Sequence, residues 1–324
     1  MTARILSGKE IAEAIKREVA EEVRALAEND GFRPCLAVVR VGEDAASAVY
    51  VGSKVKTSEE LGMISEHHHL SEDISHEELL NLVKDLNDRA EVDGILVQLP
   101  LPKQIDEREI LETIDPAKDV DGFHPINVGK LSQGQKSLVP CTPAGVIEIL
   151  KRSGIPIAGE HAVIIGRSNI VGKPMAQLLL HENATVTICH SRTRDLAEIT
   201  SQADILVAAI GRAGFVRAGH IKPGATVIDV GMNNAATAEL ARELFGADEL
   251  EKRLNTIAKR GFTLVGDVNP KEAKEKAANI TPVPGGVGLL TVAMLMKNTV
   301  EAAKMRRGEM EKRRKEDRES FNRR

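Results

Sequence analysis

Cysteines, aromatic residues and long apolar runs are all scarce in this chain of 324 residues. Its three cysteines, Cys35, Cys141 and Cys189, lie far apart without CxxC spacing, which argues against a disulfide framework or a zinc site. They suit a reducing compartment, so we expect a cytoplasmic protein without a bound metal. No apolar run approaches about 18 residues, and none follows the first charged residues, so neither a membrane span nor a signal peptide is expected.

Aromatic residues make up 2% of the chain, with no Trp and the single tyrosine Tyr50. The stacking surfaces that bind single-stranded nucleic acid are therefore missing. The net charge of −4 gives no reason to expect a polyanionic partner, although residues 301–324 hold ten Lys/Arg against six Asp/Glu. We expect this C-terminal run to be a solvated helix extension or a frayed tail, with no nucleic acid partner.

What is present is a globular composition, with 42% hydrophobic and 28% charged residues in a length that favours two domains. An amphipathic helix is predicted over 7–29. It is followed by strand, helix, strand, helix and strand patterns at 34–41, 45–61, 63–70, 75–90 and 93–99. This βαβαβ order predicts parallel strands with helices on both faces and ligand groups at the carboxyl ends of the strands.

A second α/β series begins after the break at PCTP, residues 140–143. A helix follows this break, and strands are then predicted at 161–166, 184–189, 204–208, 225–230 and near 280. This alternation indicates a Rossmann-like half. Residues 234–261 are rich in Ala, Glu and Leu and predict one or two added helices, and a further helix is predicted over 288–304.

The strand at 161–166 runs directly into a glycine turn and a helix, GRSNIVGKPMAQLLL. Backbone amides and the positive helix end would face a bound anion there. The spacing Gly166-x5-Gly172 matches neither the G-x-G-x-x-G fingerprint nor a Walker A loop. The pattern favours a phosphate site, and a strand-to-helix turn without a ligand is the alternative.

The strand at 184–189 ends in CHSRT, without the acid that commonly binds the ribose 2′-hydroxyl of NAD. His190, Ser191 and Arg192, together with Arg167, supply donors and positive charge suited to a 2′-phosphate. We therefore expect NADP rather than NAD as the cofactor. The alternative is a polar strand end with an exposed arginine.

Ser47, Tyr50 and Lys54 share one face of the predicted helix at 45–61, because they are spaced by three and four residues. A lysine at the edge of an apolar cleft can donate and accept protons near neutral pH, since desolvation disfavours the ammonium form. The tyrosine ring could stack on a flat substrate. The alternative is an ordinary pair of side chains on a helix surface.

Gln98 and Asp121 are two further candidates. Gln98 lies at the carboxyl end of the strand at 93–99, where the prolines of QLPLP turn the chain away. Asp121 lies in the polar loop KDVDGFHPIN, where a carboxylate can bind the donor edge of a nitrogen heterocycle. An Asx turn beside Gly122 is the alternative for Asp121.

Nine motifs give the chain a family resemblance: YVGSKVKTSEELGM, DGILVQLPLP, DPAKDVDGFHPINVGKL, PCTPAGV, GRSNIVGKPMAQLL, HSRT, VIDVGMN, GDV and TPVPGGVG. Because these motifs occur in the family's order and approximate spacing, the chain resembles the bifunctional methylenetetrahydrofolate dehydrogenase/methenyltetrahydrofolate cyclohydrolase family over nearly its whole length. The resemblance implies an α/β fold with two domains flanking a cleft. A three-layer α/β domain would comprise 1–143 plus 285–308, the returning C-terminal helix. A Rossmann-like NADP-binding domain would comprise 144–284, and 309–324 would be a charged tail.

The same resemblance implies roles for individual residues. Lys54 would be the general acid/base, and Gln98 would hold it in place. Tyr50 would pack against the folate ring and Asp121 would bind the pterin, so the substrate-binding set is Ser47, Tyr50 and Asp121. The cofactor-binding residues expected from the glycine loop and the resemblance together are Thr142, Gly166, Arg167, Ser168, Val171, Gly172, Ser191, Arg192, Met232 and Thr281. Four of these match positions on the nicotinamide side: Thr142, Val171, Met232 and Thr281.

Two features depart from the family pattern. Leu289 stands where the family generally has Pro at the head of the last helix, which leaves the GGVG loop freer and affects the cofactor fit. Residues 234–261 stand where the family usually has a short connection near the nicotinamide side. This insertion could form a flap, a contact surface or a tolerated excursion.

The reaction implied is oxidation of 5,10-methylenetetrahydrofolate by NADP, followed by hydrolysis of the methenyl product to 10-formyltetrahydrofolate. Both steps belong to one-carbon metabolism and purine biosynthesis, and the family is usually homodimeric. Hydride transfer needs mainly alignment, whereas hydrolysis needs water attack and proton movement, which a lysine able to be neutral can serve. The alternatives are a dehydrogenase without the cyclohydrolase step and a catalytically silent NADP-binding interaction protein that works through its basic tail.

Overall fold

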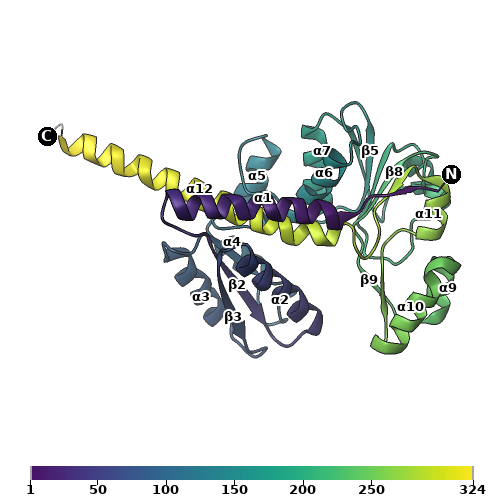
Figure 1. The fold of residues 1–324 in the computed structure, drawn as a ribbon, viewed down its shortest axis with the longest axis horizontal. Coiled ribbons are helices and arrows are strands. Elements are labelled where there is room, and N and C mark those ends of the chain that lie inside the picture. The colour runs from purple at the N-terminus through teal and green to yellow at the C-terminus, as the bar shows by residue number, and fades with distance from the viewer. Residues whose placement is uncertain (1, 323–324) are drawn as a thin grey trace. The chain divides into compact units, whose positions relative to one another are not determined.

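The computed structural model describes the backbone of residues 2–322 and the side chains of that range except those of 45–46 and 309–322. The chain forms two compact α/β units, as predicted (Figure 1). The first unit combines residues 14–141 with the C-terminal helix from Val292 on. The second combines residues 1–13 with 142–291. The expected boundary near 143 therefore lies within two residues of the observed one, and the C-terminal helix joins the first unit.

The first unit is built on a parallel sheet of three strands in the order β3-β2-β4. The strands are β2 Cys35–Val41, β3 Ile64–Leu70 and β4 Gly94–Val97. The connecting and following helices are α2 Ala45–Glu60, α3 His76–Asp88, α4 Glu107–Thr113 and α5 Pro125–Ser132. Both β2 and β4 are buried along their whole lengths, which explains their nearly continuous apolar sequences.

Two long helices complete the first unit. Helix α1 spans Gly8–Asn29 and helix α12 spans Val287–Asn322. Their ion pair between Lys304 Nζ and Glu22 Oε2, 2.7 Å apart, places them side by side (Figure 1). A Cβ added to Gly94 of β4 would contact Thr299 of α12, as well as Leu36 of the neighbouring strand β2. Helix α12 therefore covers one face of the sheet. The opposite face packs against α3 and α4, and the unit thus has three layers.

The second unit is a parallel sheet of six strands in the order β1-β11-β8-β7-β5-β6. The strands are β1 Arg4–Ile5, β5 His161–Ile165, β6 Thr185–Cys189, β7 Ile205–Ala208, β8 Thr226–Asp229 and β11 Asn279–Ile280. The helices are α6 Cys141–Arg152, α7 Gly172–His181, α8 Leu196–Thr200 and α11 Pro270–Lys276, with a 3₁₀ turn at Ala218–His220. This sheet is the predicted Rossmann-like half.

The first residues of the chain differ from the expectation. They were assigned to the first domain, whereas strand β1 pairs in parallel with β11 and extends the sheet of the second unit. The C-terminal boundary also lies at 291/292 rather than 284/285. A strand of two residues carries no detectable periodicity, so only its long-range pairing reveals which sheet it joins.

The predicted helices of the insertion are present as α9 Ala238–Leu244 and α10 Ala247–Arg260. Two short strands come before and after these helices in the chain and pair in antiparallel fashion, β9 Asn233–Ala235 and β10 Thr263–Val265. The sequence did not predict these strands. Alternation over three residues is too brief to distinguish a strand from a loop.

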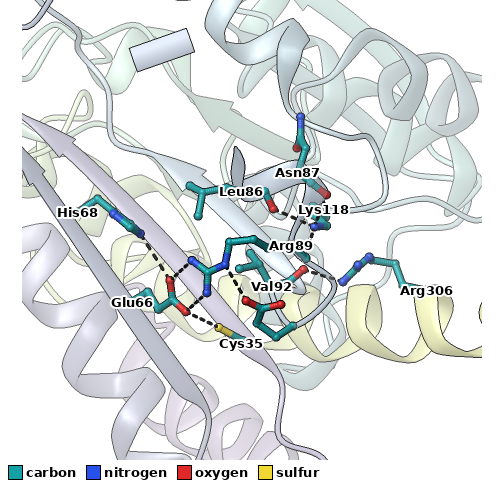
Figure 2. Close-up of polar contacts among 10 residues, drawn as sticks. Cys35, Glu66, His68, Leu86, Asn87, Arg89, Val92, Lys118 and Arg306 are labelled. Carbon is teal, nitrogen blue, oxygen red and sulfur yellow. Dashed lines mark hydrogen bonds and ion pairs between the residues drawn. The ribbon is translucent and has the colours of Figure 1, made fainter. Parts of the chain in front are cut away.

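The basic C-terminal run is only partly what the sequence suggested. The helix extension is present, because α12 continues to Asn322. Arg306, however, is only 9% exposed and donates a hydrogen bond to the Val92 carbonyl at 2.6 Å (Figure 2). It also donates to Asp93 Oδ1 at 2.9 Å. The Arg307 guanidinium lies 3.7 Å from the centre of the Phe32 ring. The expectation of a solvated run is therefore wrong for these two arginines, since buried Asp93 requires cationic partners.

Residues 309–324, the predicted charged tail, have side chains that lie outside the described part of the chain. Within the described part, we find no helix with the length and apolar character needed to cross a membrane.

Candidate active site

Helix α2 presents the predicted stripe of Ser47, Tyr50 and Lys54. Its start is fixed by Asp44, whose Oδ1 accepts a hydrogen bond from the Ser47 amide at 2.7 Å. Lys54 is 8% exposed, and its Nζ donates to Gln98 Oε1 at 2.9 Å. Tyr50 is half-buried, and this burial raises the pKa of its hydroxyl. The structure thus brings the predicted lysine and glutamine into direct contact.

Gln98 is held in one orientation. Its backbone amide donates to the Val39 carbonyl at 2.8 Å, which keeps the residue in line with β4. Its side-chain Nε2 donates to the Leu99 carbonyl at 2.7 Å. The amide nitrogen is therefore engaged by the backbone, and Oε1 is the atom left to accept a hydrogen bond from Lys54.

Asp121 reaches the same edge of the sheet on a segment that runs parallel to β4. The Ile95 amide donates to the Lys118 carbonyl at 2.8 Å, and Ile95 and Asp119 form a parallel bridge. The chain therefore reaches Asp121 and Gln98 at the carboxyl end of the strands. Burial raises the pKa of Asp121 to about 6, and the positive charge of Lys54 opposes this shift.

The Asx turn considered for Asp121 belongs instead to Asp119. The Asp119 carboxylate accepts hydrogen bonds from the Gly122 amide at 3.1 Å, the His124 amide at 2.8 Å and Asn127 Nδ2 at 2.9 Å. These hydrogen bonds are made by Asp119 and not by Asp121. Asp119 therefore fixes the conformation of the loop, and the Asp121 carboxyl remains available to a ligand. Asp119 and Asp121 lie two residues apart in one motif, so the sequence alone did not show which of the two fixes the loop.

Sequence reasoning missed two further residues that fix this loop. Lys118 is 1% exposed, and its Nζ donates to the carbonyls of Leu86, Asn87 and Arg89 at 2.6–2.9 Å (Figure 2). Burial lowers the pKa of this lysine to about 8. Asn298 of α12 donates from Nδ2 to the Val120 and Val139 carbonyls, each at 2.8 Å. The only sequence signal was the position of Lys118 inside the motif DPAKDVDG.

In the second unit, the glycine turn after β5 is tightly packed. Gly166 has a φ of +135°, and a Cβ on it would lie 2.2 Å from the Ala209 carbonyl oxygen. A Cβ on Gly172 would lie 2.3 Å from the Gly166 carbonyl oxygen. Ser168 Oγ accepts hydrogen bonds from the amides of Val171 and Gly172, where α7 begins. Glycines at these two positions allow the close turn that brings a helix N-terminus to the sheet edge.

The predicted phosphate-binding residues gather at the same edge. Strands β5 and β6 are neighbours, with Ile165 paired to Cys189, so the residues that follow them leave the sheet side by side. Arg167 follows β5, whereas Ser191 and Arg192 follow β6, and all three side chains are exposed. Two arginines and a hydroxyl beside a helix N-terminus fit the charge and donor requirements of a phosphorylated dinucleotide.

The residues predicted for the nicotinamide side are more scattered. Thr281 is buried, and its Oγ1 accepts from the Asp229 amide at 2.8 Å, which joins β11 to β8. Met232 follows β8 and is 44% exposed. Thr142 on α6 forms a hydroxyl hydrogen bond of 2.9 Å with Thr291. The structure thus places Thr281 and Met232 beyond neighbouring strands, while Thr142 contacts the start of α12.

A parallel sheet with a glycine turn, a helix N-terminus and a cationic edge defines a dinucleotide-binding domain. Joined to a unit with a buried Lys–Gln pair beside a carboxylic acid, it defines a two-domain enzyme of the dehydrogenase class. Two family models identify the enzyme further: tetrahydrofolate dehydrogenase/cyclohydrolase, catalytic domain, matches residues 6–121, and its NAD(P)-binding domain matches residues 140–307. The chain belongs to the tetrahydrofolate dehydrogenase/cyclohydrolase family.

Curated relatives agree with this assignment over almost their full lengths. The bifunctional protein FolD of Koribacter versatilis is 56% identical over 308 residues, covering 95% of this chain and 99% of the relative. The bifunctional protein FolD of Acetivibrio thermocellus is 52% identical and covers 94% and 98%. With both family domains present, the chain is a bifunctional dehydrogenase and cyclohydrolase of tetrahydrofolate derivatives.

Solved structures show the same fold. The bifunctional FolD enzyme from Campylobacter jejuni has a TM-score of 0.84 and 45% identity, covering 94% of this chain and 99% of that one. The methylenetetrahydrofolate dehydrogenase-cyclohydrolase of Trypanosoma brucei, in complex with NADP and an inhibitor, has a TM-score of 0.84 and 39% identity. It covers 94% of this chain and 98% of its own.

Proposed function

We propose that Lys54 is the general acid/base with which this enzyme converts 5,10-methylenetetrahydrofolate to 10-formyltetrahydrofolate. The observation that carries this proposal is the hydrogen bond of 2.9 Å between Lys54 Nζ and Gln98 Oε1. It holds a largely buried amine at the carboxyl edge of the sheet, and an amine in that setting can exchange protons with a substrate. Gln98 is then a positioning residue for Lys54.

NADP is the cofactor. The NAD(P)-binding domain of the family is present, and the relative from T. brucei is in complex with NADP. The chemistry that bound NADP supplies is hydride acceptance. Within the chain, Arg167, Ser168, Ser191 and Arg192 would bind the 2′-phosphate and ribose, while Gly166 and Gly172 would shape the turn beneath the phosphates. Thr142, Val171, Met232 and Thr281 would flank the nicotinamide.

The substrate would be held by residues of the first unit. Tyr50 offers an aromatic face beside Lys54, and Asp121 can bind the donor edge of the pterin. A protonated Asp121 can itself donate a hydrogen bond, because its pKa of about 6 lies near physiological pH. Ser47 lies one turn before Tyr50 on the same face of α2. For oxidation, these residues orient the substrate carbon, and alignment supplies most of the rate acceleration.

Hydrolysis of the methenyl cation makes a different demand on the same residues. A water molecule must lose a proton as it attacks the cation. As the ring opens, a ring nitrogen must gain a proton, while the hydroxyl of the water adduct loses its own proton to solvent and becomes the formyl carbonyl. Lys54 in its neutral form can take the first proton and return it to the nitrogen. The Gln98 carbonyl oxygen accepts a hydrogen bond from the lysine in either form, so the amine keeps its position through the cycle.

We also propose a homodimer located in the cytoplasm. The family is usually homodimeric, which supports the proposed dimer. The three free buried cysteines suit a reducing compartment, which supports the proposed location. Light scattering on the purified protein tests the dimer, and a single mass equal to one chain would contradict it.

Two separate assays test the proposed function. One follows NADP reduction with 5,10-methylenetetrahydrofolate, and the other follows hydrolysis of 5,10-methenyltetrahydrofolate without cofactor. We expect both activities. Reduction without hydrolysis would indicate a dehydrogenase alone, and the absence of both would indicate an NADP-binding interaction protein.

A further inference from the structure

The insertion forms a folded lobe rather than a loose excursion. Helices α9 and α10 lie next to each other (Figure 1), and together with the β9–β10 pair they share a buried apolar cluster. The buried members of the cluster are Ala235, Ala241, Leu244, Phe245 and Val265. A lobe with a core of this kind can resist bending, so it can transmit a constraint to the parts of the protein that it touches.

One side chain of the lobe, Arg253 of α10, reaches out of it. Its side chain is 13% exposed, and its guanidinium stacks 4.2 Å from the centre of the Phe245 ring. Its NH1 donates to the Leu264 carbonyl at 3.0 Å, and its NH2 donates to Glu249 Oε2 at 3.0 Å. The same NH2 donates to the Val283 carbonyl at 3.1 Å. Three of these partners lie in the lobe, and Val283 lies outside it.

Val283 belongs to the loop of residues 281–286, TPVPGG, which follows strand β11 and leads into α12. This loop lies at the carboxyl edge of the sheet, where dinucleotides bind in folds of this kind. Its end is held separately, because the Gly8 amide donates to the Gly285 carbonyl at 2.9 Å. Thr281, at the start of the loop, is bound to β8 through its own amide and hydroxyl, and Arg253 adds a contact from the lobe at Val283.

The lobe is also joined to the neighbouring strand. Met232 follows β8 and is succeeded at once by β9, the first strand of the lobe. Asn233 Nδ2 donates to Asp267 Oδ1 at 2.9 Å, and Asp267 also accepts from the amides of Ile210, Gly211 and Arg212. The lobe thus contacts the ends of β7, β8 and β11 at once.

We propose that the insertion is a brace for the cofactor site, and that Arg253 is a positioning residue that holds the 281–286 loop against the nicotinamide. This inference rests on the proposed function, which places Thr281 and Met232 on the nicotinamide side. Position 289 lies in the first turn of α12, where the Leu289 amide donates to the Gly286 carbonyl at 3.3 Å, a hydrogen bond that a proline could not make.

The test compares Arg253→Met with Arg260→Met. Met keeps most of the apolar stem of arginine but cannot donate to Val283. Arg260 is an exposed residue of the same helix and serves as the matched control. Hydrogen exchange of peptides covering 281–290 is measured without cofactor, together with dehydrogenase kcat, cofactor-free methenyl hydrolysis and thermal stability.

We expect R253M to speed exchange in the 281–286 loop and to lower dehydrogenase kcat about 10-fold, because small displacements of a reacting group cost large factors in rate. Methenyl hydrolysis should stay within about two-fold of the parent enzyme, since no nicotinamide takes part in it. R260M should match the parent in every measurement. Arg253→Lys, which retains one donor, should lie between the parent and R253M.

The inference is overturned if R253M leaves loop exchange and dehydrogenase kcat unchanged. It is also overturned if both activities fall in parallel with thermal stability, since that pattern marks a merely structural role. If R253M does not fold, R253K gives the same readings. A parent enzyme without dehydrogenase activity would contradict the proposed function, and the exchange data would still decide whether Arg253 restrains the loop.

Discussion

Lys54 Nζ lies 2.9 Å from Gln98 Oε1, and the other side of the Gln98 amide donates to the backbone of the next residue. The lysine is therefore fixed by a group that carries no charge. An aspartate or glutamate in place of Gln98 would form an ion pair with the amine, whereas the neutral amide holds it by a hydrogen bond.

The first prediction is that Lys54→Met abolishes methenyl hydrolysis, with a loss of at least about 100-fold, because general acid/base catalysis commonly contributes that much. NADP binding should persist, since the cofactor residues lie in the other unit. Stopped hydrolysis assays and NADP titration measure the two effects. Lys56→Met is the control, because Lys56 is exposed and forms an ion pair with Glu60 one turn along the same helix. Retention of more than a few per cent of the hydrolysis rate would exclude Lys54 as the general acid/base.

The second prediction concerns cofactor choice. Arg167→Ala should weaken NADP binding about 10- to 100-fold, since a charge-assisted phosphate contact contributes about 1.5–3 kcal/mol. NAD lacks the 2′-phosphate and should lose much less. Titration calorimetry with both cofactors gives the comparison, and Arg194→Ala, at an exposed position in the segment after β6, controls for overall charge. Equal losses for NADP and NAD would refute the assignment of Arg167.

The third prediction follows from the burial of Asp121. The native state raises the pKa of this carboxyl from 3.8 to about 6, so it binds the proton more tightly than the unfolded chain does. The contribution of Asp121 to the stability of the parent enzyme should therefore fall as pH rises from about 4 to about 6 and stay level above that range. Asp121→Asn removes the titrating group, so it should be more stable than the parent above pH 6, with the advantage vanishing near pH 4.

Thermal melts of paired samples across this pH range measure the effect on stability. Asp73→Asn, at an exposed position, is the control and should follow the parent at every pH. A constant difference between Asp121→Asn and the parent from pH 4 to pH 8 would contradict the prediction.

The fourth prediction concerns two truncations that differ by three residues. Removing everything after Met305 deletes Arg306 and leaves buried Asp93 without its closest cationic partner. Loss of one member of a buried ion pair costs about 3–5 kcal/mol, so this truncation should be strongly destabilised. Removing everything after Gly308 keeps Arg306 and Arg307 and should leave the stability of the parent. Urea unfolding of both truncations measures the difference, and equal stabilities would mean that the Arg306–Asp93 pair contributes nothing.

A binding assay on the same truncations addresses the basic tail. Salt-dependent RNA or DNA binding of micromolar affinity that is lost after Gly308 would revive the interaction-protein alternative, because counterion release gives phosphate contacts a steep salt dependence. We expect no such binding.

Much of the candidate site could be predicted because its residues lie on regular elements. The spacing of Ser47, Tyr50 and Lys54 places them on one helix face, and Gln98 ends a strand whose apolar run is plain in the sequence. The two carboxylates of KDVDG could not be assigned in the same way. Which of Asp119 and Asp121 turns inward depends on hydrogen bonds to His124 and Asn127, and these form only once the loop has closed.

Contacts between distant parts of the chain were the ones missed. Asn298 donates a hydrogen bond to the Val120 carbonyl across a separation of 178 residues. No sequence pattern near either residue predicts this contact. Arg306 looked like one cation among many in a basic run, because its partner Asp93 lies in a different motif. Local patterns specify helices and strands, whereas pairing over such distances depends on the assembled fold.

The position of β1 has a consequence for the protein as it leaves the ribosome. This strand is made well before its partner β11, which exists only when residues 279–280 have been added. At synthesis rates of about 5–20 residues per second, the interval between the two strands is about 14–55 s. The other unit is completed later still, because it includes α12 from Val292 on. Neither unit of a nascent chain can therefore close before residue 279 has been added, and chaperones that shield exposed strands can act during that interval.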